Sequence, residues 1–132
     1  MRSTLPTGVE GGNASESRNA YQWLIGPFIP ESTSDVRHTS DIELKWSEHA
    51  AGDARTEWSS DETATTMTLL ISGSYDTEFE DGSVFEHRSL GDYVIWKPGV
   101  NHKWTVHEDS LILTIRWPSS WTPETSAHPI DA

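Results

Sequence analysis

The chain has 132 residues, a length that predicts one domain, and its 21 acidic against 9 basic residues give a formal net charge of −12. This excess of carboxylates argues against nucleic acid or an anionic membrane as a partner, because both are bound through lysines and arginines that neutralise phosphates. Cysteine is absent, which excludes disulfides, thiolate metal ligands and thiol nucleophiles. Seven Trp stand beside three Tyr and three Phe, and indole rings suit the wall of a pocket as well as a core.

The first 18 residues are rich in Gly, Ser, Asn and Glu, so we expect 1–18 to be a disordered arm and 19–132 to form the domain. No segment resembles the apolar core of a signal peptide, and no apolar run approaches the ~20 residues of a membrane span. The sequence therefore predicts a cytoplasmic protein.

Strands are predicted from residue 21 onwards, where short stretches of alternating or β-branched residues are separated by turn residues. Residues 21–28 predict a short edge element, and Asp81-Gly82 predicts a hairpin turn. Further strands are predicted over 42–47, 65–72, 74–80, 83–87, 93–96, 104–107 and 111–117. The segment from Pro118 is expected to cover the domain or to be a loose end. With no helical periodicity in any window, these short strands predict an all-β sandwich or barrel.

The segment from Gly91 to His102 resembles the second motif of the cupin superfamily, in which a strand leads through a turn with proline and glycine to a histidine. Three features match in register: Gly91-Asp92, Pro98-Gly99 and His102. Lys97 stands where the family has its first proline, and Val106 where an asparagine is frequent. The resemblance covers about residues 40–117 and implies a single-domain jelly-roll β-barrel. It also implies a homodimer, formed by pairing at a sheet edge to which residues 20–30 could contribute.

The chain differs from the family at the positions of the metal ligands. The first cupin motif usually supplies two His and a Glu, which hold Fe, Mn, Ni or Zn together with the His of the second motif. Counted from Gly52, the two His positions hold Trp58 and Ser60; the Glu position holds Thr66, or else Ala64 or Thr65, depending on the register. Residues 50–86 contain no histidine. The resemblance therefore implies a metal-independent cupin without a cofactor, and the fallback metal ligands are His102, Glu57 and Asp61.

His102 is the candidate catalytic residue, since the resemblance implies that its ring points into the barrel. Without a metal it is either a general acid–base or a histidine that only hydrogen-bonds a ligand or a neighbour. By alternation Trp104 shares its face, and Trp58 would complete an aromatic wall. Arg55 and Glu57 have the opposite parity to Trp58 and are expected to face solvent. The remaining candidates for substrate binding are Ser60, Thr66, Thr68, Tyr93 and Trp96.

These residues favour metal-independent proton transfer by His102, of the lyase, isomerase or cyclase type, on a small, partly apolar or conjugated substrate. One alternative is a non-enzymatic cupin that senses or stores a ligand in the same pocket. A second alternative is a metal-dependent oxygenase with unusual ligands. The sequence contains no glycine-rich phosphate loop, two-histidine zinc helix or serine nucleophile elbow.

Overall fold

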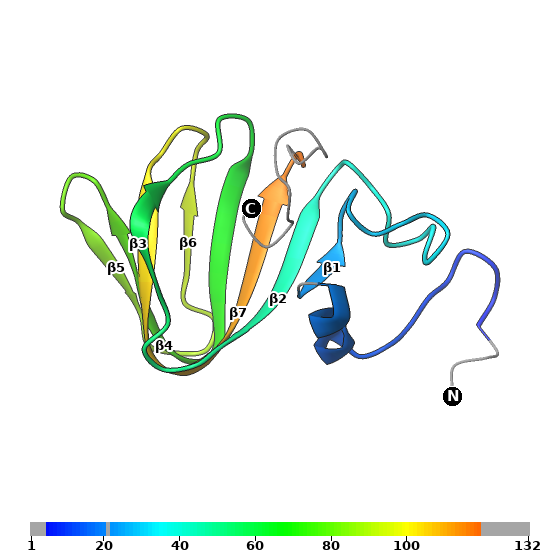
Figure 1. Cartoon of the computed structure of the whole chain (residues 1–132), viewed down its shortest axis with the longest axis horizontal. Helices are drawn as coiled ribbons and strands as arrows, with labels where there is room; N and C mark the ends of the chain where they lie inside the picture. The colour runs from blue at the N-terminus through cyan, green and yellow to red at the C-terminus, as the bar shows by residue number, and fades with distance from the viewer. Residues whose placement is uncertain (1–4, 21, 120–132) are drawn as a thin grey trace.

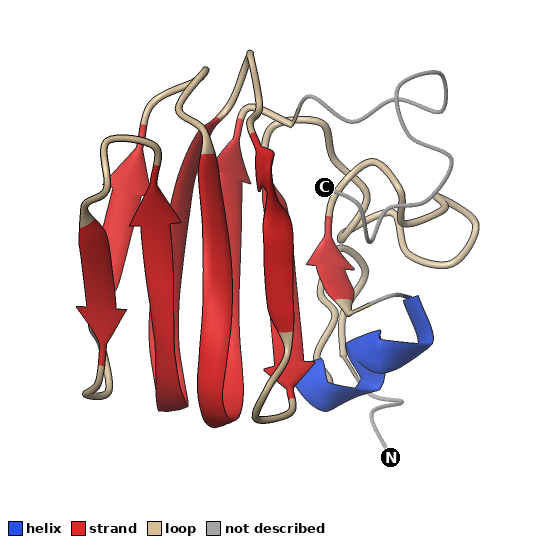
Figure 2. Ribbon diagram, turned by 60° about the vertical axis from the view of Figure 1, so that its left-hand side comes forward, coloured by secondary structure: helices blue, strands red, loops and turns tan. Residues whose placement is uncertain are grey.

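The computed structural model describes residues 5–20 and 22–119, and its backbone is mainly antiparallel β-sheet (Figures 1 and 2). Within these residues one 3₁₀ helix, η1 (Ala14–Ala20), precedes seven strands. The strands are β1 (Trp23–Ile25), β2 (Glu43–His49), β3 (Ala54–Ser59), β4 (Thr65–Phe79), β5 (Val84–His87), β6 (Tyr93–Trp96) and β7 (His102–Trp117). In this part of the chain no helix has both the length and the apolar character needed to cross a membrane.

Two long strands, β4 and β7, pair with each other along their length and connect the two halves of the sheet. The N-terminal part of β4 pairs with β6 and the C-terminal part of β7 with β2, which carries β1 at the edge. The other ends of β4 and β7 pair with β5 and β3. The sheet therefore folds over into two facing halves without closing completely, as an all-β jelly roll does (Figure 1).

The bend lies at Gly73, where the register between β4 and β7 shifts. Gly73 has a φ of +101°, and a Cβ there would collide with the side chain of Ser110 and lie 2.5 Å from the carbonyl oxygen of Asp109. Across the bend the amide of Ser74 donates to Oγ of Ser110 at 3.0 Å. The sequence analysis predicted separate strands on either side of Gly73 (65–72 and 74–80) and of residues 108–110 (104–107 and 111–117), where the structure has the two long strands β4 and β7. Those predictions were wrong, because these residues form irregularities within paired strands rather than chain reversals.

The first elements also differ from the sequence prediction. Residues 14–18, assigned above to a disordered arm, belong to η1. Oδ1 of Asn13 accepts a hydrogen bond from the amide of Ser15 at 2.9 Å, and Oε1 of Glu16 accepts one from the amide of Asn13 at 3.2 Å. These reciprocal contacts satisfy amide groups at the start of the helix. The short edge strand was predicted, whereas β3, which is largely exposed, was not.

The buried core lies at the bend and consists of Leu70, Tyr75, Val106 and Ile112, with Trp104 packed against it. Beyond the core, the half that contains β2 and β6 is polar on its inner face. One row across β2, β7, β4 and β6 pairs Glu43 with Arg116, Arg116 with Thr66, and Thr66 with Trp96. Because these side chains do not fill the space as an apolar core would, the two halves enclose a cavity.

Candidate functional site

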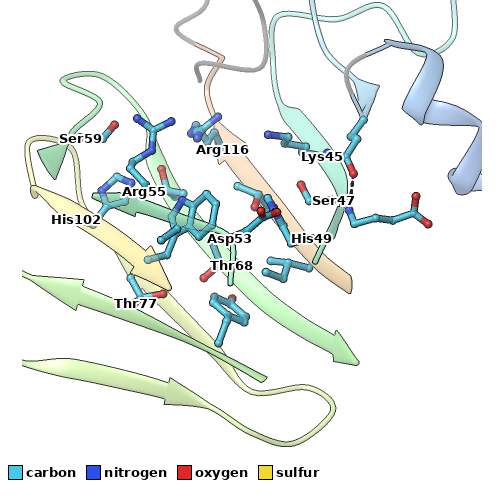
Figure 3. Close-up of a pocket in the computed structure, with 18 of the residues that line it drawn as sticks. Lys45, Ser47, His49, Asp53, Arg55, Ser59, Thr68, Thr77, His102 and Arg116 are labelled. Atoms are coloured by element: carbon cyan, nitrogen blue, oxygen red, sulfur yellow. Dashed lines mark hydrogen bonds and ion pairs between the residues drawn. The ribbon is translucent and has the colours of Figure 1, made fainter. Parts of the chain in front are cut away.

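A cavity of about 470 Å³ lies between the two halves of the sheet (Figure 3). It is lined by side chains of β2, β3, β4 and β7, together with Trp96 of β6. This volume is within the range of pockets that hold small organic molecules.

Five of the residues singled out from the sequence line this cavity: His102, Thr66, Thr68, Trp96 and Trp104. The other three candidates for substrate binding do not line it. Trp58 is 39% exposed, with Nζ of Lys103 4.4 Å from its ring centre, and Tyr93 is 55% exposed. The hydroxyl of Ser60 donates to the neighbouring carboxylate of Glu62 at 3.1 Å.

The register of β3 explains why Trp58 lies elsewhere. Arg55 pairs with Trp104 and Ser59 with His102, so Arg55 and Ser59 face the cavity. Trp58, the neighbour of Ser59, therefore has the opposite orientation. The motif alignment placed Trp58 inside and Arg55 outside, and the structure reverses both positions. The irregularity between Arg55 and Ser59 adds an even number of residues to β3 and leaves this orientation unchanged, so the motif alignment was wrong in which face of β3 it placed inside.

The ring of His102 lies in the cavity against Trp96, with 4.4 Å between the ring centres. Its Nδ1 is 3.2 Å from the carbonyl oxygen of Val100, and because a carbonyl only accepts, Nδ1 carries the proton. In the neutral ring the lone pair is therefore on Nε2. Burial is the main cause that lowers the pKa of His102; the hydrogen bond to the carbonyl of Val100 opposes this shift, the charges of Arg116 and Arg55 add to it, and the charge of Asp61 has a smaller raising effect. His102 is thus a neutral base near pH 7.

A second histidine, His49, lies at the end of β2 and lines the same cavity. Its Nδ1 is 3.3 Å from Oδ2 of Asp53, and its ring centre is 4.8 Å from that of Trp104. Burial lowers the pKa of His49, while the hydrogen bond to Asp53 opposes the shift. The sequence analysis did not select this pair. The only available signal was that His49 has the parity of Lys45 and Ser47 on β2.

Positive charge is concentrated at one side of the cavity, where Arg55, Arg116 and Lys45 lie in Figure 3. Nη1 of Arg116 is 3.3 Å from Oε1 of the buried Glu43. The side chain of Arg55 makes no hydrogen bond or ion pair with any residue that the structure describes. Burial lowers the pKa of Arg116; Glu43 opposes this shift, and the charge of Arg55 adds to it. The chain thus places two guanidinium groups near each other although it carries a net charge of −12.

The residues of the cavity do not fit the metal that cupins usually hold. Among the described residues, no three His, Asp or Glu side chains are grouped so that they could hold an ion. Of the fallback ligands, Glu57 is exposed, and Oδ1 of Asp61 accepts the amides of Thr63 and Ala64 at 2.9 and 2.7 Å. His102 instead has two arginines near it, and their charges oppose a cation.

Comparison with solved structures finds the same fold in cupins. The structure of KdgF from Halomonas sp. is 23% identical with a TM-score of 0.55, and the alignment covers 61% of this chain and 72% of that one. An RmlC-like cupin protein from Desulfovibrio desulfuricans is 12% identical with a TM-score of 0.55, covering 62% of this chain and 76% of that one. The DMSP lyase DddQ from Ruegeria pomeroyi DSS-3 is 15% identical with a TM-score of 0.55, covering 67% of this chain but 43% of that one. No protein-family model and no curated protein matches the sequence.

Proposed function

Because this chain has the cupin fold, we propose that it is a small-molecule enzyme in which His102 transfers a proton without the help of a bound metal. The reaction is of the lyase, isomerase or cyclase type. The observation that carries this proposal is the state of His102, a neutral imidazole whose Nδ1 is bound to a backbone carbonyl inside a cavity. Its Nε2 can take a proton from a bound molecule and return it. The DMSP lyase among the structural neighbours supports lyase chemistry as compatible with this fold.

The His49–Asp53 pair supplies a second site for the proton. Lyase and isomerase reactions commonly remove a proton at one atom of the substrate and deliver one at another. Asp53 stabilises the imidazolium form of His49 through the contact of 3.3 Å, whereas the nearby arginines disfavour the imidazolium form of His102. A proton taken up by His102 is therefore held weakly and is readily returned.

Incorporation of solvent deuterium tests this proposal without requiring that the substrate be identified first. The protein is incubated in D₂O with a protein-free metabolite extract, and mass spectrometry identifies any compound that gains deuterium. His102→Ala should slow the exchange by at least ~10²-fold, the lower limit for a positioned acid or base. Ser60→Ala, outside the cavity, is the matched control and should exchange at the wild-type rate.

Three results would contradict the proposal in different ways. Equal exchange by His102→Ala and the wild type would remove His102 from the mechanism. A compound that binds but gains no deuterium and is recovered unchanged would indicate the non-enzymatic alternative, a ligand-sensing or storage cupin. Stoichiometric Fe, Mn, Ni or Zn in protein prepared without a histidine tag, lost in His102→Ala, would indicate the metal-dependent alternative.

A further inference from the structure

Two residues that line the cavity carry buried hydrogen-bonding groups without a partner. Thr66 is 1% exposed and Trp96 is 7% exposed, and neither Oγ1 of Thr66 nor Nε1 of Trp96 has a hydrogen-bond partner in the described structure. Both residues line the cavity and are direct neighbours across β4 and β6. An indole N–H can only donate, and leaving it unpaired costs free energy. A ligand that fits this part of the cavity therefore presents acceptor atoms.

The same row of the sheet continues to Arg116, which pairs with Thr66 across β4 and β7. Glu43 offsets the charge of Arg116 through the ion pair of 3.3 Å. Arg55 reaches the cavity from β3 in the facing half, and no described side chain forms an ion pair with it. Asp61 is a second carboxylate whose charge acts on Arg116, and its Oδ1 already accepts two backbone amides. This side of the cavity thus has one guanidinium group whose charge is not offset by an ion pair.

We propose that the cavity binds its ligand through a carboxylate, which Arg55 holds by charge while Thr66 and Trp96 donate hydrogen bonds to the ligand's acceptor atoms. This inference rests on the proposed function, because it takes the cavity as the ligand site. A carboxylate matches the planar fork of a guanidinium and carries the single negative charge that one such arginine offsets. A phosphate monoester carries nearly two negative charges near pH 7.

The position of this subsite also defines the class of chemistry. The ring of His102 is 4.4 Å from that of Trp96, so a carboxylate held beside Trp96 brings the neighbouring carbon atoms close to His102. His102 would then remove the proton from a carbon near the carboxylate, and the electron pair of the broken C–H bond would form a new double bond. The proton is returned to another carbon in an isomerisation, or accompanies a departing group in an elimination.

The indole N–H resonance of Trp96 provides a direct measurement. Protein with ¹⁵N-labelled tryptophan is titrated with probes of similar shape that differ in their polar group. The first three probes are benzoate, its amide benzamide, and phenyl phosphate. Acetate, pyruvate and crotonate, each with its amide, extend the panel. Carboxylates should bind at least 10-fold more tightly than their amides and should move the Trp96 resonance, which the variant Trp96→Phe identifies. Arg55→Met should remove this preference, whereas Lys97→Met, which removes one charge from an exposed turn, should keep it.

The spectra of all variants also report whether they fold, and Arg55→Lys supplies a second, charge-conserving variant. Equal affinities for acids and amides, binding of phenyl phosphate alone, or no binding by any carboxylate of the panel would overturn the proposal. So would an unchanged preference in a folded Arg55→Met. These outcomes differ from failure of the proposed function, which would appear as carboxylate binding without exchange of solvent deuterium.

Discussion

Removal of the charge of Glu43 tests how much the ion pair between Glu43 and Arg116 contributes to the stability of the fold. The side chain of Glu43 is 1% exposed and that of Arg116 is 9% exposed, and Oε1 of Glu43 lies 3.3 Å from Nη1 of Arg116. The hydroxyl of Ser119 donates to the other carboxylate oxygen. Glu43→Gln keeps the shape of the side chain, but it leaves the guanidinium of Arg116 without its counter-charge and near Arg55.

The cost follows from the burial of the pair. Removing one partner of a buried ion pair destabilises a protein by ~3–5 kcal/mol. Arg116 opens onto the cavity, where water can solvate part of its guanidinium, so we expect the lower end, about 3 kcal/mol in the free energy of unfolding. In a chain of 132 residues, each 1 kcal/mol lowers Tm by roughly 4 °C, which predicts a loss of about 12 °C.

Urea denaturation followed by Trp fluorescence, together with calorimetry, measures this loss. Glu57→Gln, which removes an exposed carboxylate, is the matched control and should stay within about 0.5 kcal/mol of the wild type. Glu43→Gln combined with Arg116→Met should recover at least half of the loss, because no buried charge then lacks a partner. Glu43→Gln should also bind carboxylates more tightly than the wild type. A stability of Glu43→Gln within about 0.5 kcal/mol of the wild type would refute the reasoning.

Three further predictions concern other parts of the fold. Burial lowers the pKa of His87 from 6.5 to about 4, so the unfolded chain binds more protons than the folded one between these values, and the free energy of unfolding should decrease as the pH falls through this window. Urea denaturation across the window measures this, and an equally steep decrease in His87→Phe would exclude His87 as a cause. Gly73→Ala should lower the free energy of unfolding by at least ~3 kcal/mol in the same assay, because φ is positive there and the added Cβ collides with residues at the bend. Gly91→Ala, where φ is also positive but no atom is close, should lower it by about 1 kcal/mol. Equal losses in the two variants would refute the steric argument. The sequence-based expectation of a homodimer paired at a sheet edge is tested by sedimentation velocity, and a wild-type monomer would reject it. Pairing through β6 predicts that Ile95→Glu gives a monomer whereas Leu90→Glu in the preceding turn does not; a dimer that persists in Ile95→Glu would instead indicate pairing at the edge that carries β1.

The strands and the histidine of the motif could be predicted because their signals are local. Alternation predicted β2, a short apolar run ended by turn residues predicted β6, and the Pro98-Gly99 turn before His102 matched the cupin motif. His102 and Trp104 lie in the cavity as expected. Which side chains of β3 face the cavity could not be predicted in the same way. Because side chains alternate along a strand, the register of β3 against β7, with Arg55 opposite Trp104 and Ser59 opposite His102, decides which side chains enter the cavity, and this register exists only in the folded sheet.

The sequence by itself determined the all-β class, the cupin resemblance and a histidine without the usual metal ligands, because each depends on residue type and short spacing. Only the tertiary structure decided which charges surround that histidine. Arg55 and the His49–Asp53 pair lie close together in the chain but far from His102 and Arg116, and the folding of the sheet at the bend brings all of them to one cavity. The net charge of −12 gave no sign of this, since a sum over all residues does not show where the few arginines meet.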